Sequence, residues 1–363
     1  MMNKKIRIAV LFGGRSAEHE VSLQSAKSVV DALDKTKYEI VLIGIDKKGN
    51  WLLNNQSTFL LHAENPKLIS LNKSTKEVSI IPGSTKQLLT TSTNDQIGTV
   101  DVVFPVMHGT YGEDGSMQGL LKIMDVAFVG ADVLGSAVGM DKDVMKRLLR
   151  DAGLPIGKFI TLKQGDEMSF KQAKEKLGLP MFVKPANLGS SVGVNKVTNE
   201  TEFRNAVSEA LEYDNKILIE EFIDGREIEC AVLGNENPKA SLPGEVTPHH
   251  EFYSYESKYI DENGAGLQIP AKLSAEVSDK IRSIAIQTFQ TLCCLGMARV
   301  DCFLTKDNRV FVNEINTIPG FTKISMYPKL WEATGLPYTK LLDELITLAV
   351  QRHNEVKKLK TSF

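Results

Sequence analysis

Runs of apolar residues in the first part of the chain follow the pattern of buried parallel strands. The first run, at 6–12, is largely apolar, and the residues after it acquire helical hydrophobic spacing from about Val21. Similar runs at 38–45 and 100–105 predict two further strands. The stretch at 54–96 is polar and has only a weak pattern. The chain is therefore predicted to open with an α/β domain.

Helical and extended patterns alternate less regularly in the rest of the chain. A helix is predicted after Lys142 and ends near Gly153, and a strand at 181–185 precedes a helix at about 201–212. A further strand at 217–222 leads into a larger α+β segment. The predicted division is 1–130 for the α/β domain, 131–215 for a central domain and 216–363 for a C-terminal domain.

A hairpin near the C-terminus is predicted to carry metal-binding side chains. Apolar residues at 302–304 and 310–312 flank a polar turn. Its register can bring Asp301 and Glu314 together, with Asn316 on the same strand as Glu314. Such oxygen ligands suit Mg²⁺, which commonly shares its shell with substrate phosphates. A solvated surface hairpin is the alternative for this segment taken alone.

Composition and charge favour small-molecule partners. The chain has 363 residues, 43 basic against 45 acidic, and a net charge of −2. This balance gives no electrostatic footprint for nucleic acid or a membrane surface. The N-terminus runs into a strand without an apolar signal segment, so we expect a cytoplasmic protein. The cysteines lack CxxC spacing and are expected to be buried thiols: Cys230, Cys293, Cys294 and Cys302.

Two segments have the composition of a nucleotide site. The Gly/Ser loop at 189–193 follows a strand carrying Lys184, and its small residues would let backbone N–H groups approach phosphate oxygens. It lacks the lysine of a Walker A loop, and a flexible turn is the alternative. At 220–229 a strand, a turn and a second strand could face a purine, with Glu227 on the ribose. The alternative there is an ordinary hairpin with surface glutamates.

Other residues could hold developing charge or an amine. Gly320 follows the hairpin, so its N–H and the guanidinium of Arg299 could form an oxyanion site. A Pro-Gly turn explains the same sequence structurally. Glu18 and His108 follow the first and third predicted strands, where ligands commonly bind in parallel sheets. A carboxylate beside a histidine there could hold an ammonium group, although a lone histidine is more often structural.

Together these motifs resemble one family closely. The matching segments are 13–22, 108–115, 140–142, 183–193, 298–301 and 313–321. The chain resembles the D-alanine-D-alanine ligases of the ATP-grasp superfamily. The resemblance implies an ATP-grasp fold behind a Rossmann-like N-terminal domain. It implies that ATP phosphorylates one D-alanine and that a second attacks the acyl phosphate, giving D-alanyl-D-alanine for peptidoglycan. It also implies two Mg²⁺ or Mn²⁺ ions and a homodimer.

The resemblance further implies roles for individual residues. Those expected to act in catalysis are Glu18, Ser190, Tyr259, Arg299 and Gly320. Those expected to bind the D-alanine substrates are His108, Lys258, Ser325 and Met326. Those expected to bind ATP are Lys142, Lys184, Ser191, Glu220, Glu221, Ile223 and Glu227. The expected metal ligands are Asp301, Glu314 and Asn316. A mobile loop at about 250–268 is expected to cover the site.

Two alternatives stay open at this point. A ligase that joins D-alanine to D-lactate or D-serine would share most of these motifs, although Lys258 and Tyr259 fit the D-alanine type. Met326 stands where many relatives carry leucine, and His249 and His250 are interpreted as surface residues. A non-catalytic ATP-grasp binding protein should have lost part of the metal set or Arg299, and all of these are present.

Overall fold

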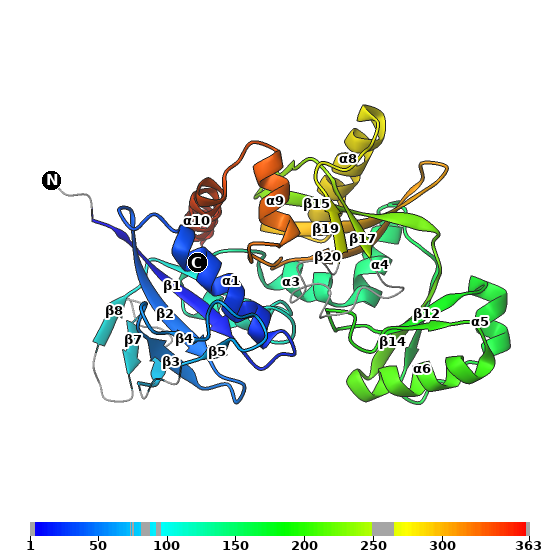
Figure 1. The fold of residues 1–363 in the computed structure, drawn as a ribbon, viewed down its shortest axis with the longest axis horizontal. Helices are drawn as coiled ribbons and strands as arrows, with labels where there is room; N and C mark the ends of the chain where they lie inside the picture. The colour runs from blue at the N-terminus through cyan, green and yellow to red at the C-terminus, as the bar shows by residue number, and fades with distance from the viewer. Residues whose placement is uncertain are drawn as a thin grey trace.

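The computed structural model describes residues 4–72, 74, 76–80, 88–91, 96–248 and 265–360. Within them, three larger sheets follow one another along the chain, each with its own helices (Figure 1). The first sheet lies at the left of Figure 1, the central sheet at the lower right, and the third between and above them. The predicted mixture of α/β and α+β parts is confirmed.

The first sheet is mainly parallel, and its strands include the three that the apolar runs predict. Its order is β10-β9-β1-β2-β3, and only β3 runs antiparallel. The strands are β1 (Ile6–Gly13), β2 (Tyr38–Ile45), β3 (Trp51–Asn54), β9 (Val102–Val106) and β10 (Ala127–Phe128). Helices α1 (His19–Ala32) and α2 (Ser116–Ile123) follow β1 and β9. Because β1 and β9 are parallel neighbours, Glu18 and His108 leave the same sheet edge.

The polar stretch between β3 and β9 holds short strands despite its weak pattern. They form two small sheets beside the first one: β4 (Leu60–Leu61) with β5 (Ser70–Leu71), and β6 (Val78–Ile80) with β7 (Leu88–Thr91) and β8 (Gln96–Thr99). Strands this short give too few residues for alternation to stand out in the sequence.

The central sheet is antiparallel and carries two helices on its outer face. Its strands, in order, are β11 (Phe159–Lys163), β14 (Lys216–Glu221), β12 (Met181–Pro185) and β13 (Asn195–Val197), with α5 (Phe170–Leu177) and α6 (Glu200–Tyr213). The capping box of Ser169 and Gln172 starts α5, and the Asn199 side chain caps α6. Strand β14 joins this sheet, although the expected domain boundary stood just before it.

The third sheet carries most of the polar side chains discussed below. Its strands, in order, are β18 (Ala265–Gln268), β17 (Gly244–Pro248), β15 (Gly225–Gly234), β19 (Gly296–Thr305) and β20 (Val310–Asn316), with β16 (Lys239–Ala240) beside β15. The helices around it are α3 (Val133–Met140), α4 (Lys142–Asp151), α8 (Ala275–Thr291), α9 (Met326–Ala333) and α10 (Tyr338–Val356). In the described part of the chain, no helix combines the length and apolarity needed to cross a bilayer.

Side-chain alternation gives the third sheet one apolar face and one polar face. Val300 and Cys302 are buried in a core with residues of α4 and α8. Asp301 lies between these two residues in sequence, and Arg299 comes directly before Val300. Both side chains point to the opposite face and line a cavity. The predicted hairpin is confirmed, since β19 pairs antiparallel with β20 and Asp301 lies opposite Glu314.

The segment at 220–229 does not form the ordinary hairpin considered as an alternative. β14 pairs only within the central sheet, whereas β15 pairs with β17 and β19. The turn between them therefore connects two sheets. A strand-turn-strand pattern in sequence does not reveal this, because it says nothing about which strands pair.

The expectation that all four cysteines are buried is wrong for Cys293. Cys230, Cys294 and Cys302 are buried, whereas Cys293 is exposed just after α8 in left-handed backbone, with φ +54°. Burial raises the pKa of the Cys230 and Cys294 thiols to about 12. Burial also raises the pKa of Cys302.

Alkylation should therefore distinguish Cys293 from the other three cysteines. At about pH 8, iodoacetamide should modify Cys293 in the folded protein and leave the others intact, because only the thiolate reacts and the buried thiols hold their protons. In urea all four should react. Peptide mass spectrometry measures both states, and modification of Cys230 in the native protein would contradict the burial described here.

Candidate active site

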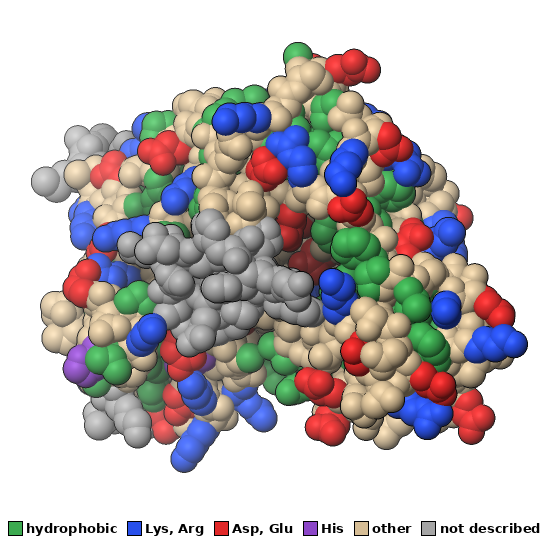
Figure 2. Space-filling model, turned by 45° about the vertical axis from the view of Figure 1, so that its right-hand side comes forward, with side chains coloured by type: hydrophobic (Ala, Val, Ile, Leu, Met, Phe, Trp, Pro, Cys, Tyr) green, Lys and Arg blue, Asp and Glu red, His purple; other side chains and the backbone are tan. Residues whose placement is uncertain are grey.

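A cavity lies where the three sheets meet. The residues that line it come from all three parts of the chain: Glu18, Gly109, Glu113, Gly139, Met140, Lys142, Gly189, Ser190, Glu227, Glu229, Leu267, Arg299, Asp301, Glu314, Ile315, Asn316, Thr317, Gly320, Ile324, Ser325, Met326 and Lys329. In Figure 2, acidic side chains lie deep in a hollow near the centre of the face shown. The predicted residues that line it are Glu18, Lys142, Ser190, Glu227, Arg299, Asp301, Glu314, Asn316, Gly320, Ser325 and Met326.

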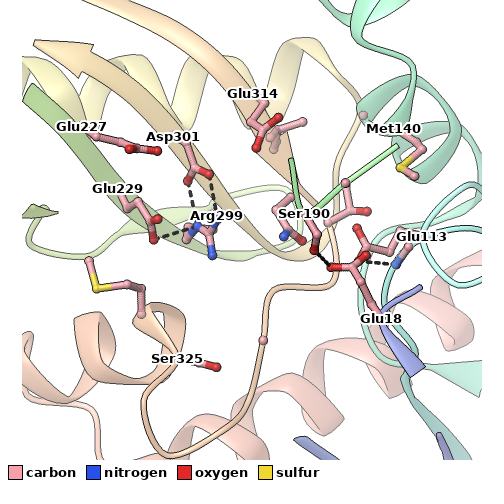
Figure 3. Close-up of a pocket in the computed structure, with 18 of the residues that line it drawn as sticks. Glu18, Glu113, Met140, Ser190, Glu227, Glu229, Arg299, Asp301, Glu314 and Ser325 are labelled. Carbon is pink, nitrogen blue, oxygen red and sulfur yellow. Dashed lines mark hydrogen bonds and ion pairs between the residues drawn. The ribbon is translucent and has the colours of Figure 1, made fainter. Parts of the chain in front are cut away.

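A row of carboxylates crosses the third sheet on the cavity side. Glu229 on β15 lies opposite Asp301 on β19, which lies opposite Glu314 on β20. Figure 3 shows these side chains beside one another, with Glu227 two residues before Glu229 on the same strand. A register shift between Asp301 and Cys302 interrupts the pairing of β19 with β20, which continues on both sides of it. The sequence predicts Asp301 and Glu314 as partners and misses Glu229.

Arg299 is bound between two of these carboxylates. Its Nε and Nη2 donate to the two oxygens of Asp301, each at 2.7 Å. Its Nε also lies 2.9 Å from Oε2 of Glu229. A two-point guanidinium–carboxylate pair fixes the plane of the guanidinium as well as its position. Arg299 is therefore oriented before any ligand binds.

The wall of the cavity that carries the acidic row is suited to binding cations. Among the described residues, Arg299 pairs with Asp301 and Glu229 in this row, and Nζ of Lys142 lies 3.6 Å from Glu314. Asn316 Oδ1 is buried and receives no hydrogen bond from the described residues. A buried acceptor of this kind is costly unless a ligand satisfies it. Within the described ranges, no three His, Cys, Asp or Glu side chains already converge as a metal site.

Glu18 forms the opposite wall of the cavity. It precedes α1, is 7% exposed, and accepts a hydrogen bond from the Ser190 hydroxyl, as Figure 3 shows. Ser190 belongs to the Gly/Ser loop and has left-handed backbone, with φ +53°. The Ser16 hydroxyl accepts from the Glu18 N–H at 3.0 Å. A carboxylate held in this way is directed into the cavity.

Gly109 keeps Glu18 in place by having no side chain. It has φ +74°, and a Cβ there would lie 2.6 Å from Oε2 of Glu18 and 2.5 Å from Oγ of Ser16. Gly153 has nearly the same backbone, φ +73°, but no atom lies within 4 Å of its Cβ position. Both positions disfavour alanine for backbone reasons. Only Gly109 adds a steric conflict with the site.

The pair of variants Gly109→Ala and Gly153→Ala should separate these effects. Each should lower the free energy of unfolding by about 1 kcal/mol through its backbone. Gly109→Ala should in addition displace Glu18 and lower the affinity for a ligand held by that carboxylate at least tenfold. Chemical unfolding and ligand titration measure the two quantities. Equal ligand affinity in the two variants would show that Glu18 is not constrained by Gly109.

His108 lies behind the cavity and connects three segments. Its Nδ1 donates to the Ile318 carbonyl at 2.9 Å, and its Nε2 lies 3.1 Å from Oγ of Ser25, which accepts from the Phe321 N–H. Burial lowers the pKa of His108, but the hydrogen bond and charge of Glu113 more than offset it, so the pKa lies above its usual value. The network fixes the chain on both sides of Gly320.

This raised pKa predicts a pH-dependent stability. A histidine whose pKa is higher when folded stabilises the folded state fully below its unfolded pKa of 6.5, and that contribution is lost as pH rises through the folded value. Glu113→Gln should remove most of the effect. As pH rises, the difference in free energy of unfolding between wild type and the variant should fall. The fall should be about 1.4 kcal/mol for each pH unit by which the folded pKa of His108 exceeds its unfolded pKa. Urea unfolding between about pH 5.5 and 8.5 measures it, and a pH-independent difference would contradict it.

A second charged group lies between the central sheet and α4. Glu220 is buried and forms ion pairs with two lysines, its Oε2 2.7 Å from Nζ of Lys184 and its Oε1 3.2 Å from Nζ of Lys146. Burial lowers the pKa of Lys146, and the charge of Lys184 adds to the effect. Burial alone would raise the pKa of Glu220, but the two lysines hold it below its usual value. Sequence reasoning found Lys184 and Glu220 but missed Lys146.

Three further residues predicted to bind ATP do not line the cavity: Glu221, Ile223 and Ser191. Glu221 accepts the Lys158 N–H at 2.7 Å, and Ile223 packs near Gly157. Ser191 follows Ser190 in the Gly/Ser loop with φ +59°. Lys142 reaches the same loop, donating to the Leu188 carbonyl at 2.7 Å. The loop is thus linked to the helix that carries Lys142.

The third group of predicted residues lies at the start of α9. Ser325 is the N-cap residue of this helix, and Met326 is its first residue and is buried. The Ser325 hydroxyl accepts the Thr322 N–H at 3.0 Å. Helix N-termini attract negative charge. Lys329, one turn further on, also lines the cavity and was not anticipated.

Some expectations fall outside the described residues. Lys258, Tyr259, His249 and His250 lie in the segment that the structure does not describe. The expected covering loop at 250–268 is described only from Ala265, where β18 begins.

Comparison with known proteins gives consistent matches over the chain. Family models described as D-ala D-ala ligase N-terminus and C-terminus match residues 7–131 and 148–347. A D-alanine--D-alanine ligase from Oceanobacillus iheyensis is 57% identical over 361 residues, covering 99% of both chains. The resemblance predicted from the motifs is confirmed.

Solved structures of related enzymes share the fold. A D-alanine-D-alanine ligase from Coxiella burnetii aligns with TM-score 0.85 and 43% identity, covering 98% of this chain and 96% of its own. A D-Ala:D-Ser ligase from Enterococcus faecalis gives 0.84 and 35%, covering 95% and 100%. A D-alanine--D-alanine ligase from Bacillus anthracis complexed with ATP gives 0.73 and 28%, covering 97% and 99%. The chain belongs to the D-alanine-D-alanine ligase family.

Proposed function

We propose that this protein uses ATP to join two D-alanine molecules into D-alanyl-D-alanine, a precursor of peptidoglycan. The observation that carries the proposal is the cavity itself. It places a fixed carboxylate, Glu18, opposite a fixed guanidinium, Arg299, with the start of α9 at a third side. An amino acid offers an ammonium and a carboxylate to such a site.

The first D-alanine would bind with its ammonium on Glu18. The carboxylate of Glu18 is nearly buried and already takes the Ser190 hydroxyl, so it can accept further donors without reorganising. His108 would support this wall from behind through Glu113 and Gly109, whose N–H donates to Glu113 at 3.0 Å. The D-alanine carboxylate would then face the acidic row and its arginine.

ATP would bind between the central sheet and the third sheet. Lys142 and Lys184 would bind phosphate oxygens under the loop that carries Ser191, and Glu220, Glu221, Ile223 and Glu227 would contact the adenosine. Asp301, Glu314 and Asn316 would hold two divalent cations, and the buried Asn316 Oδ1 supports this choice. When bound, such cations offset charge repulsion as a phosphoryl group is transferred to a carboxylate.

The second step would rely on Arg299 and Gly320. Attack of the second amine on the acyl phosphate creates a tetrahedral carbon with a negative oxygen. The guanidinium of Arg299 and the Gly320 N–H would donate to this oxygen from positions fixed in advance. The loop that holds Gly320 is anchored by the Phe321 N–H on Ser25.

The second D-alanine would bind by its carboxylate at the start of α9. Ser325 and the Met326 N–H offer donors there, and the helix dipole favours an anion. Lys258 would complete this subsite, and Tyr259 would reach toward Ser190 and Glu18, when the covering loop closes and excludes water. Closure would protect the acyl phosphate from hydrolysis.

Competition between acceptors tests this function. With ATP, Mg²⁺ and D-alanine alone, we expect phosphate release and D-alanyl-D-alanine by mass spectrometry. With equal D-serine or D-lactate added, the dipeptide should remain the main product. The structural similarity to a D-Ala:D-Ser ligase favours the serine product as the second candidate. Preferential D-alanyl-D-serine would establish that candidate, and release of no phosphate would favour a binding role.

We also infer a homodimer in the cytoplasm, where ATP is available. Sedimentation at working concentration should give a species of twice the chain mass of 40.1 kDa. A single species at the monomer mass would contradict the dimer.

A further inference from the structure

Glu229 is a cavity carboxylate to which the proposed function gives no role. It lies on β15 opposite Asp301 and is 4% exposed. Its Oε2 is 2.9 Å from Nε of Arg299, and the same Nε donates to Asp301 at 2.7 Å. Figure 3 shows the guanidinium between the two carboxylates. The Nε–H group therefore donates to Asp301, and Glu229 lies against the same guanidinium as an ion-pair partner.

The two carboxylates are not equivalent in this arrangement. Asp301 takes two parallel hydrogen bonds from Arg299, which makes it the main partner. Yet Asp301 is also a proposed holder of divalent cations. An N–H···O hydrogen bond is strong only when it is nearly linear. Arg299 therefore cannot keep both hydrogen bonds to Asp301 if that carboxylate turns to another partner. Glu229 then stays within reach on the neighbouring strand.

We propose that Glu229 is a positioning residue that holds the guanidinium of Arg299 in the cavity while Asp301 is engaged by ligands. The inference rests on the proposed function, because it places Glu229 in service of the same oxyanion group. The Arg299 side chain is only 15% exposed, so a guanidinium without a carboxylate partner there would be costly. A fixed partner preserves the donor geometry that stabilises a transition state.

The position of Glu229 suits this role better than that of its neighbour Glu227. Glu227 lies on the same face but opposite Phe303, two residue pairs further from Arg299 in the register than Glu229. Glu229 and Arg299 come from adjacent strands that are paired along their whole common length. Side chains on paired strands have little freedom to separate.

The test compares Glu229→Gln with a matched variant in the same sheet. Glutamine keeps the shape but removes the charge, so we expect kcat to fall about 10- to 100-fold. The KM for ATP and the unfolding midpoint should change little. Glu245→Gln removes a carboxylate that pairs with Arg226 at 2.6 Å across β15 and β17, outside the cavity lining. That control should keep wild-type kcat.

A double-mutant cycle identifies Arg299 as the residue through which Glu229 acts. In the Arg299→Met background, Glu229→Gln should lower kcat less than about twofold, because the group it positions is gone. A second readout needs no turnover. With Mg²⁺ and ATP bound, NMR should show the Arg299 Nε proton exchanging with water faster in Glu229→Gln than in wild type.

Each other result would overturn the inference. Unchanged kcat and proton exchange would mean that Glu229 does not hold Arg299. An equal loss of kcat with and without Arg299 would mean that it acts elsewhere. A rise in the KM for ATP at constant kcat would assign Glu229 to nucleotide or cation binding. If wild type forms no D-alanyl-D-alanine, the proposed function fails, while the proton-exchange comparison still decides the contact.

Discussion

Arg299→Met should lower turnover by a factor of about 100 or more while ATP still binds. Methionine keeps an unbranched apolar side chain but has no charge and no N–H donor, so the negative oxygen of the tetrahedral intermediate would lose its fixed cationic partner. The guanidinium is held by Asp301 and Glu229 before ligands arrive, so its contribution requires no reorganisation. Steady-state phosphate release gives turnover, and calorimetry gives the affinity for ATP.

Arg226→Met is the matched control for this prediction. Arg226 lies on β15 and makes a two-point pair with Glu245, at 2.8 and 2.6 Å, in the same sheet. Its loss removes a comparable arginine–carboxylate pair away from the cavity lining. Near-wild-type turnover of this variant is expected. Unchanged turnover of Arg299→Met would refute the oxyanion role, and equal losses in both variants would indicate a general effect on the sheet.

Glu18→Gln should lower kcat/KM for D-alanine on the order of 100-fold, with little effect on ATP binding. Glutamine can still accept the Ser190 hydroxyl but offers no charge to an ammonium group. Loss of a charged hydrogen-bond partner in a nearly buried site costs about 2 to 5 kcal/mol, and each 1.4 kcal/mol is about tenfold. Substrate titration at saturating ATP measures the effect.

Glu20→Gln provides the control on the same helix. Glu20 lies in the first turn of α1 and pairs with Lys47 at 2.6 Å, with its side chain 34% exposed. Removing its charge changes the local electrostatics of α1 without touching the cavity. A similar loss of kcat/KM in both variants would show that Glu18 acts through the helix rather than through the substrate.

The sequence predicts those features that follow from local alternation and motif spacing. The long apolar runs give β1, β2 and β9, and the spacing between Asp301 and Glu314 gives their pairing across the hairpin. Such features depend on residues that are close in sequence. They account for most of the acidic wall of the cavity.

The features that the sequence misses depend on contacts between distant segments. Glu229 joins the acidic row only because β15 pairs with β19, and strand partners are not readable from a single strand-turn-strand pattern. Lys146 had a usable signal, since it lies four residues after Lys142 on one helix and such residues share a face. Its importance nevertheless comes from Glu220, which another sheet supplies.

Isotope transfer from D-alanine is the most direct test of the proposed chemistry. D-alanine labelled with ¹⁸O in its carboxylate would be incubated with ATP and Mg²⁺, and the products analysed by mass spectrometry. Ligation through an acyl phosphate predicts D-alanyl-D-alanine together with phosphate that carries one ¹⁸O atom. Unlabelled phosphate, or phosphate release without dipeptide, would contradict it.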